Sequence, residues 1–284
     1  MDFYFQIIGS ALFAGFVAIC VTVAIEKFGG VVGGILGTIP TTIVPAAIGI
    51  YLSADNSDAY LISMCIVPIG MFLNACFLGV WKIIPGKISG YSSGKKLSVT
   101  LLAALTFWVV AGVLMIWFSE ELLSRNVDPL TIAIVATACL LAMGILVTWR
   151  GESGPRGNRE VSSWVLLLRG LAAAIAIGVA VWLSGVGLPL LSGLVSVFPA
   201  IFLTSMVALW ISQGEDVPTG AAGPMMLGGG SVSAYAIVAM WSLPTLGAWS
   251  GSAVAWFGSV VLWSLPAWLY VNSRRHLHKP SSRE

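Results

Sequence analysis

The sequence predicts an all-α polytopic membrane protein of about nine transmembrane helices, built from two inverted-topology repeats with interrupted helices. Three observations predict this fold class. Of the 284 residues 58% are hydrophobic and only 9% are charged, whereas soluble domains carry roughly a quarter charged residues. The apolar residues form runs long enough to cross a bilayer, with Lys and Arg clustered between alternate runs. Glycines and prolines that interrupt these runs recur at a constant offset, which aligns Gly34 with Gly193 and Pro40 with Pro199.

The runs give nine candidate spans, which are residues 5–26, 30–53, 59–81, 98–118, 129–149, 163–184, 187–212, 218–242 and 246–271. With nine spans the basic residues gather on one face: Lys27, Lys82, Lys87, Lys95, Lys96, Arg150, Arg156, Arg159, Arg274, Arg275, Lys279 and Arg283. Only Arg125 falls on the other face. Because cytoplasmic loops carry the excess of Lys and Arg, we expect the N-terminus outside and the C-terminus in the cytoplasm.

The same offset aligns further identical residues in the two halves of the chain. The pairs are Leu12 with Leu171, Ala14 with Ala173, Gly34 with Gly193, Pro40 with Pro199, Ser53 with Ser212, Gly70 with Gly229 and Ala75 with Ala234. We therefore expect a first repeat of four helices at 1–121, a linker with a fifth helix at 122–161, and a second repeat of four helices with a basic tail at 162–284. An offset of five spans is odd, so the two copies have inverted topology, which is typical of secondary transporters. Chance recurrence of common membrane residues is the alternative.

Each copy places a proline inside a span, six residues after a glycine. Such a proline frees a backbone carbonyl, which membrane helices tolerate where the group is buried in protein or lines a wet cavity. The polar residues beside the prolines are therefore predicted to bind substrate: Thr38, Pro40, Thr41 and Thr42 in the first copy, and Pro199, Thr204 and Ser205 in the second. The alternative is a packing kink whose hydroxyls bond back to the backbone.

The third and eighth spans are also predicted to be interrupted, by Pro68 and by the three glycines at 228–230. Their polar residues, Asn74, Ser231 and Ser233, join the predicted substrate site. Their thioethers suit a soft cation such as Cu(I), so the predicted metal ligands are Met64, Met71, Met225 and Met226. The alternative for these methionines is apolar gap filling.

Ionisable residues inside the spans are few. Arg169 lies several residues inside the sixth span, where it either reaches back to the cytoplasmic interface or faces the protein and pairs with a carboxylate or an anionic substrate. Acidic residues at both mouths, Asp55 and Asp58 outside and Glu215 and Asp216 inside, would concentrate cations. No span holds a central Asp or Glu, and no Ser-His-Asp, HExxH or paired-carboxylate set is present. We therefore expect neither an enzyme nor a bound cofactor.

The stretch Ser192-Gly193-Leu194-Val195-Ser196-Val197-Phe198-Pro199 resembles the Gly-Leu-Val-x-x-Phe-Pro core of the small GlpM-type bacterial inner-membrane proteins. Members of that family look like single copies of such a helix group and are linked to exopolysaccharide production. The resemblance implies a protein of the bacterial inner membrane that arose by duplication. The first copy departs from the pattern at Thr38-Ile39-Pro40, so no functional residue is carried over.

The sequence favours a secondary transporter that moves a small solute by alternating access, with a small cation or a transition-metal ion ahead of a neutral or anionic solute. The alternative is a membrane scaffold or assembly factor that transports nothing, for instance in envelope polysaccharide synthesis. The expected partners are the solute and the lipid bilayer, with no nucleic acid. Whether the chain forms a homo-oligomer is left open.

Overall fold

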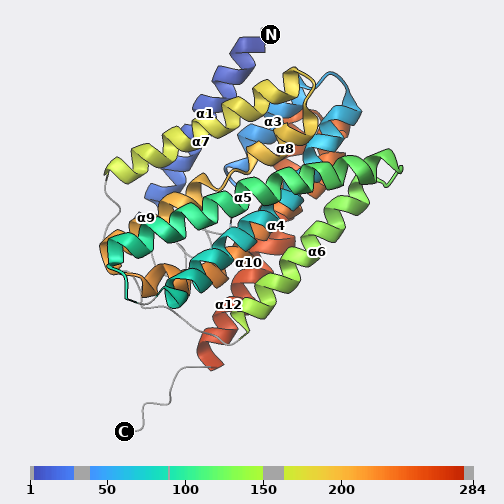
Figure 1. Ribbon diagram of the computed structural model, residues 1–284. Coiled ribbons are helices and arrows are strands. Elements are labelled where there is room, and N and C mark those ends of the chain that lie inside the picture. The colour runs from blue at the N-terminus through green and yellow to red at the C-terminus, as the bar shows by residue number, and fades with distance from the viewer. Residues whose placement is uncertain (1–2, 29–38, 89, 150–162, 278–284) are drawn as a thin grey trace.

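A computed structural model describes residues 3–28, 39–88, 90–149 and 163–277, and these residues form helices and turns without a strand (Figure 1). Eight helical stretches in this part of the chain are long and apolar enough to cross a membrane. The protein therefore has the character of an integral, all-α membrane protein. The predicted span 30–53 contributes a short apolar helix at its end, and its first residues lie outside the described residues. The count of nine thus stays a prediction.

The helices follow the predicted runs closely. In the first half they are α1 (Phe3–Phe28), α3 (Ile43–Ser53), α4 (Ser57–Lys87) and α5 (Ser93–Ser124), followed by α6 (Pro129–Thr148). In the second half they are α7 (Ser163–Gly185), α8 (Pro189–Ser196), α9 (Ala200–Gln213), α10 (Asp216–Leu246), α11 (Ala248–Ser259), the π-helical turn η1 (Val260–Ser264) and α12 (Leu265–Leu277). Local chemistry sets several starts: Asn56 caps α4 through a side-chain bond to the Ala59 amide, and Asp128 caps α6 ahead of Pro129.

Helices α4 and α10 form the centre of the bundle, and 78% and 72% of the residues in their apolar windows are buried. They run antiparallel, because Tyr60 at the start of α4 donates a hydrogen bond to the Ala239 carbonyl near the end of α10 (3.0 Å), while Gly79 near the end of α4 faces Met226 near the start of α10. Helix α6 packs against both of them, and α5 packs on α4.

A second antiparallel pair, α1 and α7, covers one side of this centre (Figure 1). A Cβ atom added at Gly15 would lie 2.9 Å from the Gly170 carbonyl oxygen, and one added at Gly170 would lie 2.6 Å from the Ile19 side chain. Further along, Gly178 faces Ala11 at 3.2 Å. Small residues thus let the two helices approach closely, as is common between membrane helices.

The predicted interruption at Pro199 is present, but those of the third and eighth spans are wrong, because α4 and α10 are continuous helices. Pro68 removes a single helical hydrogen bond inside tightly packed α4, which the surrounding helices tolerate. The glycines at 228–230 instead make room for neighbours: Gly230 lies against the Trp263 ring, and a Cβ at Gly229 would lie 3.0 Å from the Met71 methyl.

The last predicted span contains an irregularity that the sequence did not predict. Helix α11 passes through the π-helical turn η1 into α12 just before Pro266. Proline cannot donate a hydrogen bond, and a wider turn is one way to accommodate it within a continuous span. The turn places the Trp263 indole where it donates to the Leu227 carbonyl of α10 (2.8 Å).

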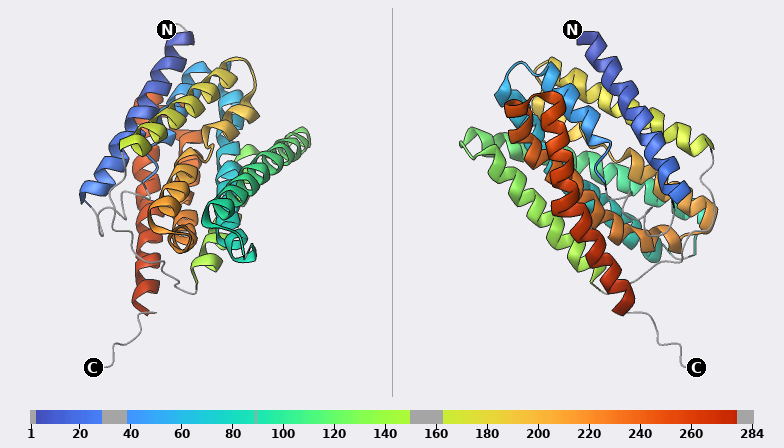
Figure 2. Two further views of the ribbon diagram at one scale, coloured as in Figure 1. Left: turned by 60° about the vertical axis from the view of Figure 1, so that its left-hand side comes forward. Right: turned by 180° about the vertical axis from the view of Figure 1, so that it is seen from behind.

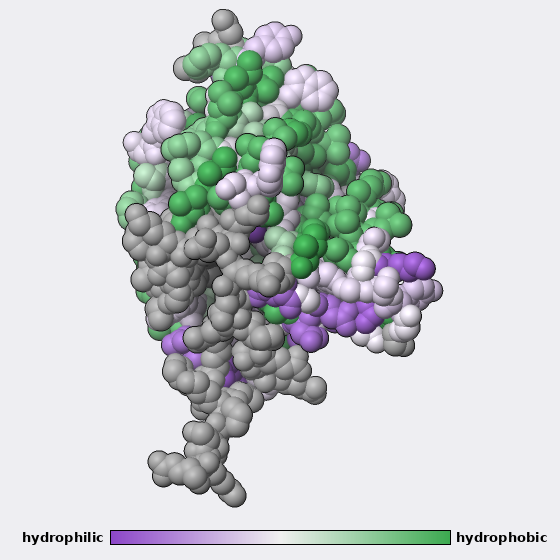
Figure 3. Space-filling model, turned by 90° about the vertical axis from the view of Figure 1, so that its left-hand side faces the viewer, coloured by the Kyte–Doolittle hydropathy of each residue, from purple (hydrophilic) through white to green (hydrophobic). Residues whose placement is uncertain are grey.

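Side-chain contacts near the helix ends show which of the loops between helices lie at the same end of the bundle. Lys96 forms an ion pair with Glu215 (2.9 Å), and the Arg274 guanidinium stacks over the Trp149 ring at 4.1 Å. At the other end the Asp55 carboxylate lies near Gly187. The start of α1 and the end of α12 lie at opposite ends of the bundle (Figure 2). Apolar residues cover the face near α1 and α7, and hydrophilic residues gather toward the end where α12 finishes (Figure 3).

Candidate functional site

The site is built around the break between α8 and α9. Helix α8 ends in a tightened turn, because the amides of Val197 and Phe198 bond to carbonyls only three residues earlier, at 3.3 and 3.0 Å. Pro199 then has no amide hydrogen to donate. Because the chain leaves the helical conformation between the end of α8 at Ser196 and the start of α9 at Ala200, the Val197 carbonyl lies outside the helical hydrogen-bond ladder, inside a span.

The side chain of Asn74, on α4, forms hydrogen bonds at this break. Its side-chain amide donates a 2.8 Å hydrogen bond to the Val197 carbonyl, and its amide oxygen accepts a 2.8 Å hydrogen bond from the Trp108 indole of α5. Asn74 is 2% exposed. The Phe198 ring packs edge-on against Trp108, with ring centroids 5.2 Å apart. The predicted site residue Asn74 therefore ties α4, α5 and the interrupted helix together in this conformation.

Arg169, Thr204 and Ser205, which the sequence singled out separately, lie together on the other side of the break. The Arg169 guanidinium donates to Thr204 Oγ1 at 3.2 Å and to Ser205 Oγ at 2.8 Å. Arg169 is 9% exposed and Ser205 is 8% exposed. The guanidinium therefore faces α9 and not the surrounding lipid. Charged side chains within membrane spans are unfavourable, and such residues usually serve a function.

The site residues predicted in the first copy, around Pro40, are less fully described. Pro40 is buried just before α3, and Thr41 and Thr42 are half-buried beside it. The Thr41 amide bonds to the Ile39 carbonyl at 2.9 Å. Thr38 lies outside the described residues. The proline-led start of α3 thus parallels Pro199 at the start of α9, while the substrate role of the three threonines stays a prediction.

The methionines lie in the core between α4 and α10. The Met71 methyl packs on Gly229, and the Met226 methyl lies 3.7 Å from where a Cβ at Gly79 would stand. Met71 of α4 thus packs on a glycine of α10, and Met226 of α10 packs on a glycine of α4. Met64 is buried and Met225 is half-buried. Among the described residues no group of three His, Cys, Asp or Glu side chains is placed to hold a metal ion, so the thioether site stays a prediction.

The two serines of α10 that the sequence assigns to the site are both buried, with Ser231 at 2% exposure and Ser233 at 0%. The Ser233 hydroxyl has no hydrogen-bond partner, which is uncommon for a buried polar group. At the offset that aligns Pro40 with Pro199, Ser233 corresponds to Asn74, the residue whose side chain bonds to the break.

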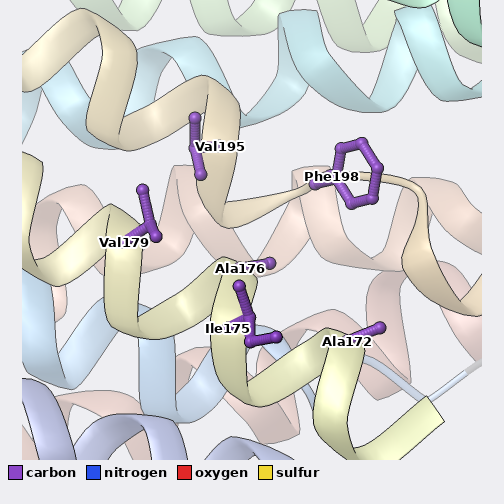
Figure 4. Close-up of a pocket in the computed structure, with 6 residues that line it drawn as sticks. All are labelled: Ala172, Ile175, Ala176, Val179, Val195 and Phe198. Atoms are coloured by element: carbon purple, nitrogen blue, oxygen red, sulfur yellow. The ribbon is translucent and has the colours of Figure 1, made fainter. Parts of the chain in front are cut away.

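An open hollow lies beside the break, between α7 and α8 (Figure 4). Its volume is about 330 Å³, and it is lined by Ala172, Ile175, Ala176, Val179, Val195 and Phe198. These side chains are all apolar, and Ile175 and Val179 are exposed. The hollow is thus an apolar surface groove that ends at the interrupted helix, one helical turn from Arg169.

Sequence reasoning missed two groups that shape the site. Trp108 holds Asn74 from α5, and the only signal for it is a tryptophan far from either end of a span, where interfacial tryptophans are expected. Lys96 and Glu215 join the start of α5 to the turn before α10, and both were noted only as loop charges. Pairing between loops distant in sequence cannot be read from either residue alone.

No protein-family model, no curated protein and no solved structure matches this chain. The resemblance of residues 192–199 to the GlpM-type proteins therefore stays a prediction. The structure does give a local reason for the glycine and proline of this stretch, since Gly193 packs directly on α4 and Pro199 starts α9.

Proposed function

We propose that this protein is a secondary transporter that moves a small solute by alternating access. The observation that carries the proposal is a helix interrupted inside a span, with its freed carbonyl held by Asn74 and with Arg169 beside it. Irregular backbone at membrane depth is stable only inside protein or along a water-filled path, and broken helices form the binding sites of many transporters.

The helix pattern supports the proposed inverted repeat. Helices α4 and α10 begin and end at equivalent positions of the two copies, because the offset that aligns Pro40 with Pro199 also aligns Ser57–Lys87 with Asp216–Leu246. A two-fold axis in the membrane plane makes equivalent helices antiparallel, whereas an axis along the membrane normal makes them parallel. The equivalent pairs α4 with α10 and α1 with α7 are both antiparallel. Helix α6, the extra span between the repeats, packs on both α4 and α10.

Two solute classes follow from different observations. Buried thioethers in α4 and α10 and the acidic residues near the helix ends support the small cation or transition-metal ion that the sequence favours. The buried Arg169 supports the anionic solute. We assign the protein to the bacterial inner membrane from the resemblance of residues 192–199 to the GlpM-type proteins, and we place its N-terminus outside from the distribution of basic residues.

The proposed orientation predicts which ends of the bundle can be labelled from outside. In a variant whose four cysteines are replaced, we expect Lys95→Cys to react with a membrane-impermeant maleimide only after the cells are opened. Arg125→Cys, at the other end, should react on intact cells, and both positions are exposed. Labelling of Lys95→Cys on intact cells would show that the orientation is wrong.

Counterflow in proteoliposomes tests the transporter itself. Liposomes preloaded with one unlabelled compound are diluted into a trace of the same labelled compound, using divalent metal ions, phosphate, sulfate, small carboxylates and an uncharged sugar in turn. We expect transient accumulation above equilibrium for at least one class, because an alternating-access site exchanges solutes in both directions. Protein-free liposomes are the control. Absence of counterflow for every class would favour the scaffold function instead.

A further inference from the structure

Among the buried side chains in the described part of the chain, Arg169 is the only one that carries a charge. It lies on α7, six residues after the helix begins, and its guanidinium points toward α9. Burying a charge inside a membrane span is unfavourable, so a residue of this kind is expected to act on a substrate or ion.

The two hydroxyls of α9 hold the guanidinium in a fixed orientation. Thr204 Oγ1 donates its own hydrogen to the Ala200 carbonyl (2.8 Å), so its oxygen is available to accept from Arg169 Nε. Ser205 Oγ accepts from Arg169 Nη2 at 2.8 Å. Both hydroxyls accept hydrogen bonds from the guanidinium and so orient it. A planar guanidinium has five N–H donors in a geometry that matches carboxylate and phosphate oxygens.

Comparison with the other copy indicates that helix packing does not require this charge. Given the proposed repeat, Arg169 corresponds to Ser10, and the two hydroxyl residues correspond to Pro45 and Ala46. Helices α1 and α3 pack together as α7 and α9 do, with the small Ser10 side chain lying against Gly49. The charged cluster is therefore specific to the second copy.

The cluster also adjoins the break. Thr204 lies one turn into α9 after Pro199, and Arg169 lies one turn before Ala172, which lines the hollow in Figure 4. A small change in the direction of α9 relative to α7 would separate the guanidinium from its two hydroxyls. The charged cluster therefore lies next to the break, which is where the proposed alternating-access site lies.

We infer that the transported solute carries a small oxyanionic group, a carboxylate or a phosphate-type oxyanion, which Arg169 binds while Thr204 and Ser205 position the guanidinium. This inference rests on the proposed transport function and chooses its anionic class over the cation. The solute would replace one or both hydroxyls on the guanidinium with bidentate, charge-assisted hydrogen bonds.

The test is the concentration dependence of uptake into proteoliposomes of labelled inorganic phosphate, sulfate, acetate and succinate. Wild-type protein should take up at least one of them, and the panel separates phosphate-type from carboxylate recognition. Arg169→Gln should abolish that uptake, and Arg169→Lys should raise KM by about tenfold because an ammonium ion cannot bind two oxygens in the guanidinium geometry. Arg125→Gln, which removes an exposed arginine paired with Glu121 (2.7 Å), should leave uptake unchanged.

Ser205→Ala keeps the Arg169 charge and is the second test variant if Arg169→Gln does not fold. We expect a KM several-fold higher with an unchanged maximal rate, because the guanidinium loses one positioning contact. A purely structural tie would lower the melting temperature of these variants and leave KM unchanged, which would overturn the inference. Counterflow of cations or sugars alone, unaffected in Arg169→Gln, would overturn it while the transport function stands. A wild-type protein without any counterflow would remove the transport function itself.

Discussion

Replacing Asn74 with leucine should both destabilise the protein and abolish transport. Leucine has a similar size but no polar atoms, so the buried Val197 carbonyl and the Trp108 indole would each lose their partner. Each unsatisfied buried group costs about 1–3 kcal/mol, so we expect the free energy of unfolding to fall by about 4 kcal/mol. Reversible unfolding in mixed detergent micelles measures this change, and counterflow measures the loss of transport.

Trp108→Phe is the matched control for this prediction. It removes only the indole donor and leaves the bond between Asn74 and the Val197 carbonyl in place, so the break keeps its direct support. We expect a loss of about 1–2 kcal/mol, with counterflow retained. If Asn74→Leu were as stable as wild type and still active, the break would be held by other contacts and Asn74 would not be part of the site.

A linear sequence pattern specifies the helices of this protein but not which of them is interrupted. Proline removes the same backbone donor at positions 68, 199 and 224, yet only Pro199 of these three interrupts a helix. The difference lies in the surroundings, since Asn74 and Trp108 supply the polar contacts that stabilise an open turn at Val197. Sequence periodicity finds the helices, because their apolar content is local. It does not predict which helix a tertiary contact will open.

The candidate site likewise combines residues that the sequence identifies with contacts that the sequence does not predict. Arg169, Thr204 and Ser205 were each identified as polar residues inside apolar spans, because a polar group in a membrane is informative by itself. Their contact with one another depends on how α7 packs on α9, which no local pattern specifies. The methionines were identified from residue type alone, and the structure packs Met71 and Met226 each against a glycine of the facing helix. Residue type indicates what a group can bind, whereas geometry decides whether several groups can bind one ligand.

Gly193→Val should be among the most destabilising single substitutions in the chain. A Cβ at this position would collide with the Ser63 carbonyl oxygen and lie 2.9 Å from Ile66 Cβ, so α8 could fit only by moving away from α4. That movement would strain the hydrogen bond from Ser192 to the Ala180 carbonyl (2.8 Å) and the bond that holds Val197 to Asn74. Overpacking of a tight core costs about 1–3 kcal/mol, and the lost hydrogen bonds add to it.

We therefore expect the free energy of unfolding to fall by about 4 kcal/mol, measured in the same micelle titration. Gly79→Ala is the matched control, because a Cβ there would lie 3.7 Å from the Met226 methyl, which is an ordinary contact, and alanine is favoured over glycine within a helix by about 1 kcal/mol. Wild-type stability in Gly193→Val would mean that α8 does not pack on α4 as closely as described. Loss of stability and of counterflow together would show why a glycine stands six residues before the proline: it lets α8 approach α4 closely enough for Asn74 to reach the break.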